Sequence, residues 1–139
     1  MKILLATGAA TVVGFLVGWL LFGLLLMGWY ESQTIMYEGL HKAIPDMGIL
    51  FAAHIPWALM LAYALDKMGA RSLMGGMLPA AIISALAILS MDLFMSSMMN
   101  LWHSPLVIVV DTVANAVWGG LMGMAAGWVL GRGENASAA

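Results

Sequence analysis

Four long stretches of apolar residues, separated by short polar segments, run along the chain. A helix that crosses a lipid bilayer needs about 20 predominantly apolar residues in a row. Four segments meet this requirement: residues 3–28, 47–65, 73–99 and 105–130. The pattern therefore predicts an all-α protein, an integral-membrane four-helix bundle, with residues 1–139 forming a single transmembrane domain.

The composition agrees with a lipid environment. Of the 139 residues, 63% are hydrophobic and 9% are charged, whereas roughly a quarter of the residues in a soluble domain are charged. A soluble protein of this length could not cover so much apolar surface, so membrane lipid is an expected partner. The formal net charge of −2 gives no reason to expect nucleic acid as a partner. The chain has no cysteine, which excludes disulfides and thiolate metal sites.

The basic residues are unevenly divided between the two sides that four membrane crossings define. One side receives four of them: Lys2, Lys67, Arg71 and Arg132. The other side receives Lys42. Because loops on the cytoplasmic side carry the excess of lysine and arginine, we expect both termini in the cytoplasm, including the polar tail of residues 131–139.

Residues 29–46 form the longest segment outside the predicted helices. Its apolar residues recur at near-helical spacing: Ile35, Met36, Leu40 and Ile44. This spacing is typical of a short amphipathic helix lying on the membrane surface, here ended by Pro45. Gly39 in the middle lowers the helix propensity, so a plain polar loop is the alternative.

Aromatic residues border the same side of the membrane, at Trp29, Tyr30 and Trp102. Rings that combine an apolar body with a polar atom concentrate at the membrane–water interface. We expect these three side chains to mark the outer interface, and ordinary packing within the protein is the alternative.

Glycines in the predicted helices indicate close helix packing. The fourth helix carries them four residues apart, at Gly119, Gly123, Gly127 and Gly131, and the first helix carries Gly14 and Gly18. Because lipid tails are as apolar as leucine, helices in a membrane associate through close backbone approach, which glycine permits. The partner helix belongs either to the same chain or to a second copy, and a homo-oligomer or a larger membrane complex is an expected assembly.

Four polar residues fall inside the predicted membrane helices: His54, Asp92, Asp111 and Asn115. An acidic residue at mid-helix costs at least about 2.5–3.5 kcal/mol, so it needs a partner or a water-filled space. At ~1.5 Å per residue, the three ionisable groups lie roughly 9–12 Å below the outer surface. Asn115 lies one turn below Asp111 on the same face. We expect these residues to form one cluster in the outer half of the bundle.

Two interpretations of this cluster remain open. It either binds or conducts a small cation, a proton or a cationic solute, or it is a hydrogen-bonded knot that only sets helix register. In the second case the protein would be an accessory subunit that packs against a larger membrane complex through its glycines. No nucleophile–base pair, phosphate-binding loop or metal-hydrolase motif is visible, so we expect neither catalytic residues nor an enzyme.

Cofactor binding has weak support in the sequence, and none is expected. Met91 and Met95, with His103 beyond them, could supply soft ligands to Cu(I). However, the 14 methionines are spread over all four segments, and methionine is a common filler of apolar helices. His54 is the one histidine well inside a predicted helix, so a pigment with a single histidine ligand is the other option.

Three segments resemble a known group of membrane proteins: "GWLLFGLLL", "MDLFMSSMMNLW" and "VDTVANAVWGGLMGMAAGWVLG". Over about residues 10–130 the chain is similar to uncharacterised four-helix bacterial membrane proteins grouped under domains of unknown function. The resemblance implies a multi-pass protein of the bacterial inner (plasma) membrane. It also implies that Asp92, Asn100-Leu101 and Asp111 are shared features. It implies no activity.

Overall fold

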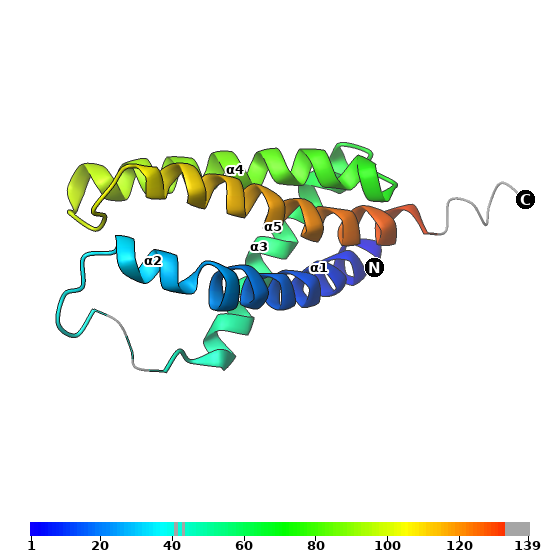
Figure 1. Ribbon diagram of the computed structural model, residues 1–139. Coiled ribbons are helices and arrows are strands. Elements are labelled where there is room, and N and C mark those ends of the chain that lie inside the picture. The colour runs from blue at the N-terminus through cyan, green and yellow to red at the C-terminus, as the bar shows by residue number, and fades with distance from the viewer. Residues whose placement is uncertain (41, 43, 133–139) are drawn as a thin grey trace, which may run out of the picture.

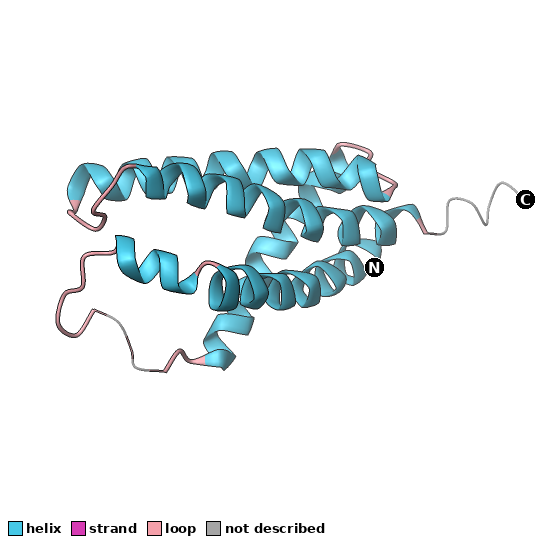
Figure 2. Ribbon diagram, in the orientation of Figure 1, coloured by secondary structure: helices cyan, strands magenta, loops and turns pink. Residues whose placement is uncertain are grey.

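The computed structural model of the protein describes residues 1–40, 42 and 44–132. These residues form helices joined by short loops, and they contain no β-strand (Figure 2). The elements in chain order are α1 (Lys2–Gly18), the π-helical segment η1 (Trp19–Leu25), α2 (Met27–Gln33), α3 (Met47–Lys67), α4 (Leu73–Met98) and α5 (Leu106–Gly131).

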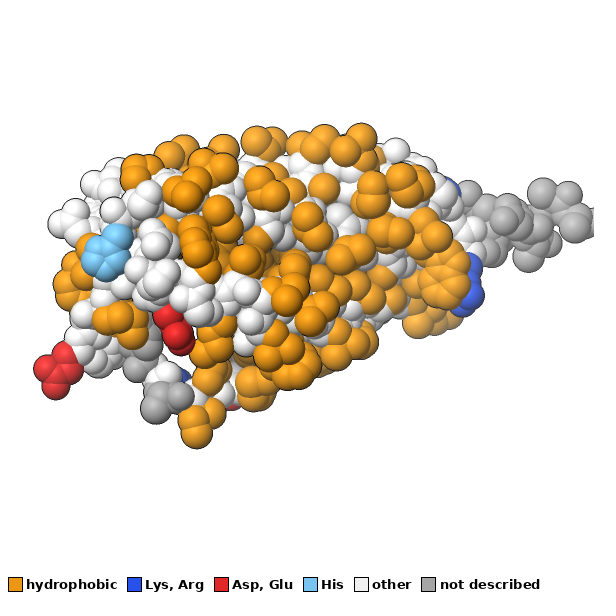
Figure 3. Space-filling model, viewed as in Figure 1, with side chains coloured by type: hydrophobic (Ala, Val, Ile, Leu, Met, Phe, Trp, Pro, Cys, Tyr) orange, Lys and Arg blue, Asp and Glu red, His pale blue; other side chains and the backbone are white. Residues whose placement is uncertain are grey.

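The four predicted membrane helices are confirmed as helices of sufficient length and apolarity. They cover Lys2–Leu25, Met47–Lys67, Leu73–Met98 and Leu106–Gly131, and the first of them consists of α1 and η1. Large hydrophobic side chains cover most of the visible face, with charged groups toward its ends (Figure 3). Such a surface is suited to lipid and not to water.

Helix α5 is the centre of the bundle. It contacts α4, α1 and α3. Of the residues in its apolar membrane-length stretch, 44% are buried, against 11% of those in the corresponding stretch of α4. Figure 1 shows α4 and α5 side by side and antiparallel, with α1 along the other side of α5 and α3 crossing behind them. Lys2, Lys67, Arg71 and Arg132 lie at the helix ends that meet near the N-terminus, which we name the basic end. The opposite end, with α2 and the segments 34–46 and 99–105, is named the loop end.

Short polar residues cap the starts of α3 and α4. The Asp46 side chain accepts a hydrogen bond of 3.0 Å from the backbone N–H of Ile49, and Ser72 accepts one of 3.0 Å from Gly75. These caps satisfy donors that a helix start leaves free. After α3, Gly69 adopts φ +70°, a left-handed conformation that glycine takes without strain. The chain therefore reverses within a few residues and enters α4.

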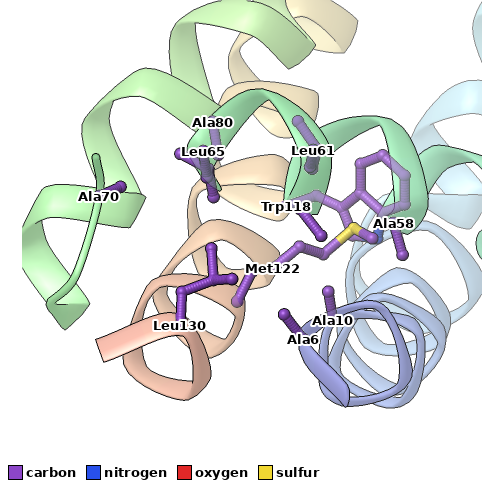
Figure 4. Close-up of a cluster of buried hydrophobic side chains, with 12 residues drawn as sticks. Ala6, Ala10, Ala58, Leu61, Leu65, Ala70, Ala80, Trp118, Met122 and Leu130 are labelled. Carbon is purple, nitrogen blue, oxygen red and sulfur yellow. The ribbon is translucent and has the colours of Figure 1, made fainter. Parts of the chain in front are cut away.

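The packed core lies in the half of the bundle toward the basic end. Figure 4 shows Ala6 and Ala10 of α1 facing Leu61 of α3 and Met122 of α5. All four side chains are fully buried. The buried residues of α3 begin at Ala58, and η1 and α2 contain none. The first membrane helix and α3 are therefore tightly packed toward the basic end and bury no residue in η1 or before Ala58, whereas α5 still buries Val107 near its start.

The glycines of α5 pack against α4 of the same chain. A Cβ atom built at Gly123 would overlap the Cβ of Ala80 and the carbonyl oxygen of Gly76, and one at Gly119 would overlap the Ser84 side chain. Glycine is needed here because the two backbones approach too closely for any side chain. Of the two alternatives for the fourth helix, the contact seen in the structure is the one within the same chain.

Gly127 and Gly131 continue the same contact toward Ser72 and Arg71 at the start of α4. The glycines of α1 have different neighbours. Gly14 faces the Met122 side chain, and Gly18 faces the rings of His54 and Trp118. Five of the six predicted packing glycines therefore lie against neighbouring helices of this chain, and Gly131 lies against the turn that precedes α4.

The loop segment differs from the amphipathic helix expected between residues 35 and 44. Its described residues form extended chain and turns, and the short helix lies earlier, at Met27–Gln33. The backbone N–H of Ile35 donates to the Leu101 carbonyl oxygen over 2.8 Å, and that of His103 donates to Gln33 over 2.8 Å. Pairing with the 99–105 turn satisfies the backbone groups, and Gly39 at φ +78° turns the chain. Residues 41, 43 and most of the polar tail (133–139) lie outside the described residues.

Candidate functional site

Two carboxylic acids face each other where α4 ends and α5 begins. Asp92 lies near the C-terminus of α4 with 8% of its surface exposed, and Asp111 lies half-buried near the start of α5. The two helices are antiparallel, so these ends are adjacent. The carboxyl groups are within electrostatic and hydrogen-bonding reach of each other. Asp92 therefore points into the bundle, as the sequence analysis expects.

Tyr30 completes this acidic site from the opposite helix. Its hydroxyl group donates a hydrogen bond to Oδ1 of Asp111. Burial, together with this hydrogen bond, raises the pKa of the Tyr30 phenol above its ordinary value of 10.0. The phenol therefore stays protonated and acts as a donor. We name Tyr30, Asp92 and Asp111 the acidic triad.

The negative charge of the triad has no basic partner among the described residues. The ion pair that the described residues contain joins Arg71 to Asp66 over 3.0 Å at the basic end. In addition, Oδ2 of Asp92 is buried and has no hydrogen-bond partner within the described chain. A buried carboxylate oxygen usually has at least one partner. The site is therefore arranged to accept a further positive or donating group.

A pocket of about 660 Å³ connects Asp111 with the loop end. Glu31, Thr34 and Lys42 line it together with Tyr30 and Asp111. Two of these groups are acidic and one is basic. Asp111 is thus reachable from outside the bundle, whereas Asp92 lies behind it.

A second pocket, of about 630 Å³, lies between α1, α3 and α5 and is lined mainly by aromatic and apolar side chains. We name it the aromatic pocket. His54, Asn115 and Trp118 contribute its polar atoms. The Asn115 side chain donates a hydrogen bond of 2.9 Å to the backbone oxygen of Asp111, so it links the two pockets.

His54 lies in the aromatic pocket, and its described interactions are there. Nδ1 is 2.7 Å from the Leu50 carbonyl oxygen, and the ring makes edge contacts with Phe15 and Trp118 at centroid distances of 5.7 Å each. Trp118 is itself held by a buried hydrogen bond of 2.8 Å from its Nε1 to the Gly14 carbonyl oxygen. The imidazole therefore forms part of an aromatic wall.

The three candidate metal ligands named in the sequence analysis lie mostly at the surface. Met91 and His103 are exposed and Met95 is half-buried. Within residues 1–40, 42 and 44–132, no group of three or more histidine or acidic side chains is placed to hold a metal ion.

The structure therefore joins Asp92 to Asp111, places Asn115 one turn along α5, and places His54 on a neighbouring wall. The sequence analysis placed Tyr30 at the membrane interface and did not include it in the polar cluster. Its position just beyond the first membrane helix was the one feature that could have indicated its contact with Asp111. No protein-family model, curated protein or solved structure matches this chain.

Proposed function

We propose that this chain is a multi-pass membrane protein that binds a cation at the acidic triad of Tyr30, Asp92 and Asp111. One observation supports this most directly: two carboxyl groups face each other inside the bundle and form no ion pair with a described residue. Two adjacent carboxylates in a low dielectric are not stable together unless a positive charge or a proton lies between them. A cation that enters through the pocket supplies this charge.

The packing at the basic end favours binding over an open pore. Ala6, Ala10, Leu61 and Met122 are fully buried and fill the space between α1, α3 and α5. The pockets next to the triad lie on the other side of this core, at the loop end. We therefore propose a site that is reached from one side of the membrane.

The charge distribution suggests which side this is. Four of the five basic residues lie at the basic end, and the positive-inside rule assigns that end to the cytoplasm. The triad then faces the outside of the cell. By the resemblance noted in the sequence, the membrane is the bacterial inner membrane.

The test is a binding measurement on the purified protein in lipid nanodiscs. Equilibrium dialysis is carried out with sodium, guanidinium and tetraphenylphosphonium ions, for the unmodified protein and for Asp111→Asn and Asp92→Asn. Glu38→Gln, at an exposed acid in the 34–46 segment of the loop end, is the matched control. We expect at least one cation to bind the unmodified protein and the control equally. Loss of one carboxylate should weaken that binding at least about tenfold.

Asparagine keeps the shape of the side chain, so the variants should remain folded, which circular dichroism and size-exclusion chromatography check. The proposal is refuted if none of the three cations binds. It is also refuted if Asp111→Asn and Asp92→Asn both bind as tightly as the control.

A further inference from the structure

We propose that the cation bound by the acidic triad is an organic one with a large apolar body, such as an aryl- or alkyl-substituted ammonium or phosphonium ion. Its charge would lie beside Asp111, and its apolar body would fill the aromatic pocket. This inference rests on the proposed function and specifies the class of ligand.

The two pockets are adjacent and share part of their lining. Phe22, Met27 and Pro45 line both of them. Asn115 lines the aromatic pocket while its side chain is bonded to the backbone of Asp111, which lines the other. A single ligand can therefore contact the carboxyl group and the aromatic wall at once.

The chemistry of the aromatic pocket does not suit a small inorganic ion. Its wall includes Phe15, Trp19, Phe22, His54 and Trp118. Hard cations need several oxygen ligands, which these side chains do not offer. Apolar groups gain free energy by leaving water for such a surface, and aromatic rings attract a nearby positive charge.

The backbone of the first membrane helix is shaped around this pocket. At η1 the helix widens to π-helical hydrogen bonding, and the N–H of Leu26 donates to the Leu21 carbonyl oxygen over 2.8 Å. Trp19, Phe22 and Gly23 of this segment all line the aromatic pocket. Wide turns of this kind occur frequently at functional sites.

Gly18 keeps the floor of the pocket open. A Cβ atom there would lie 3.3 Å from Nε2 of His54 and 3.3 Å from Nε1 of Trp118. His54 and Trp118 both line the aromatic pocket, from α3 and α5. A larger residue at this position would fill the space that a ligand needs.

The charges at the entrance favour a cation over a lipid. Glu31 and Asp111 line the entrance and Asp92 lies behind them, and among the described lining residues Lys42 is the one basic side chain. An anionic lipid head group would be repelled by the acids. A lipid without charged groups would leave the triad without a positive partner, and a zwitterionic lipid would bring its phosphate next to the acids together with its ammonium group. An apolar cation matches both the wall and the entrance.

The experiment compares ligands that differ in charge and in apolar surface. Equilibrium dialysis in nanodiscs is carried out with labelled tetraphenylphosphonium, with guanidinium as the small cation and with triphenylphosphine oxide as the neutral analogue. We expect tetraphenylphosphonium to bind saturably and at least about tenfold more tightly than guanidinium. The neutral analogue should show no binding that depends on Asp111.

A pair of neighbouring substitutions tests the pocket itself. Leu50 lines the aromatic pocket from α3 and is 41% exposed, so Leu50→Trp should fill the space without disturbing the core. Ile49→Trp, at the adjacent and 65% exposed position, is the matched control. We expect at least about tenfold weaker tetraphenylphosphonium binding for Leu50→Trp and less than about a twofold change for Ile49→Trp. Met47→Trp on the pocket rim is a second filling variant should Leu50→Trp not fold.

The outcomes separate the inference from the proposed function. If guanidinium or sodium binds as tightly as tetraphenylphosphonium in an Asp111-dependent way, and filling the pocket has no effect, the inference is wrong and the proposed function stands. If no cation shows binding that depends on Asp111 or on Asp92, both are wrong. If the neutral analogue binds as tightly as tetraphenylphosphonium, the aromatic pocket is a lipid site and the inference is wrong.

Discussion

The hydrogen bond from Tyr30 to Asp111 joins α2 to α5 through two residues that are 81 positions apart in the sequence. The phenol donates to a carboxyl group that also lies next to Asp92. A hydrogen bond to a charged acceptor is stronger than one between neutral groups. This contact therefore both orients Asp111 and ties α2 to α5.

Replacement of Tyr30 by phenylalanine should destabilise the protein in a pH-dependent way. The ring keeps its contact with Phe22 at a centroid distance of 6.2 Å, while the lost donor should cost about 1–2 kcal/mol of unfolding free energy at neutral pH. The folded protein raises the pKa of this phenol from its ordinary value of 10.0. The stabilisation by Tyr30 is therefore fully present below pH 10 and is lost as pH rises above it, because the unfolded chain then loses its proton first.

Thermal unfolding in detergent between pH 7 and pH 11 measures this difference. Tyr63→Phe, at an exposed position on α3 toward the basic end, controls for the general effect of high pH on the protein. A stability difference between the unmodified protein and Tyr30→Phe that stays constant over this range would contradict the assignment.

At the scale of the helices, the contact between α4 and α5 depends on the absence of side chains. Gly76 of α4 faces Gly123 and Gly127 of α5, so backbone lies against backbone. Asp92 of α4 and Asp111 of α5 lie on the loop-end side of this contact. The close approach of the two helices at the glycines also brings these two side chains together. The glycines therefore contribute to the site although they are distant from it.

Gly123→Leu should separate α4 from α5. The new side chain would overlap Ala80 and the Gly76 backbone, and overpacking of this kind costs about 1–3 kcal/mol or more. We expect a lower melting temperature in detergent. Gly8→Leu is the matched control, because nothing lies within 4 Å of a Cβ at Gly8, and it should melt like the unmodified protein. Equal melting temperatures for the two variants would show that the α5 glycines do not form this contact.

For the whole molecule, the buried hydrophobic cluster lies toward the basic end and the two pockets lie toward the loop end. The buried hydrophobic cluster extends from Leu130 to Trp118 along α5, and the aromatic pocket begins at Trp118. Trp118 therefore lies at the boundary between the hydrophobic core and the aromatic pocket. Access to the acidic triad is then determined by which end faces the cytoplasm.

The proposed orientation is tested by single cysteines, since the chain has none of its own. Ser32 is exposed on α2 at the loop end, and Met68 is exposed in the turn at the basic end. In intact cells, Ser32→Cys should react with a membrane-impermeant maleimide and Met68→Cys should react only after the cells are lysed. The reverse pattern would place the triad on the cytoplasmic side.

The sequence by itself determined the number and approximate limits of the helices that are long and apolar enough to cross a membrane, and that Asp92 should face other helices. Hydropathy is summed along a segment, so Lys2–Leu25 and Leu106–Gly131 are recognisable without any knowledge of their neighbours. The cost of a buried acid likewise required Asp92 to face the bundle. Both properties belong to single segments.

Only the tertiary structure decided which side chains meet. Tyr30 bonds to Asp111 at the loop end, whereas His54 packs on Phe15 at the level of Gly18, further from that end. The choice depends on the rotation of each helix about its axis, which neighbouring helices set. In the first helix, the π-helical turns of η1 also shift every later residue away from the 3.6-residue period. The direction of Tyr30 could therefore not be read from its spacing, and the pocket beside it exists only because the helices separate there.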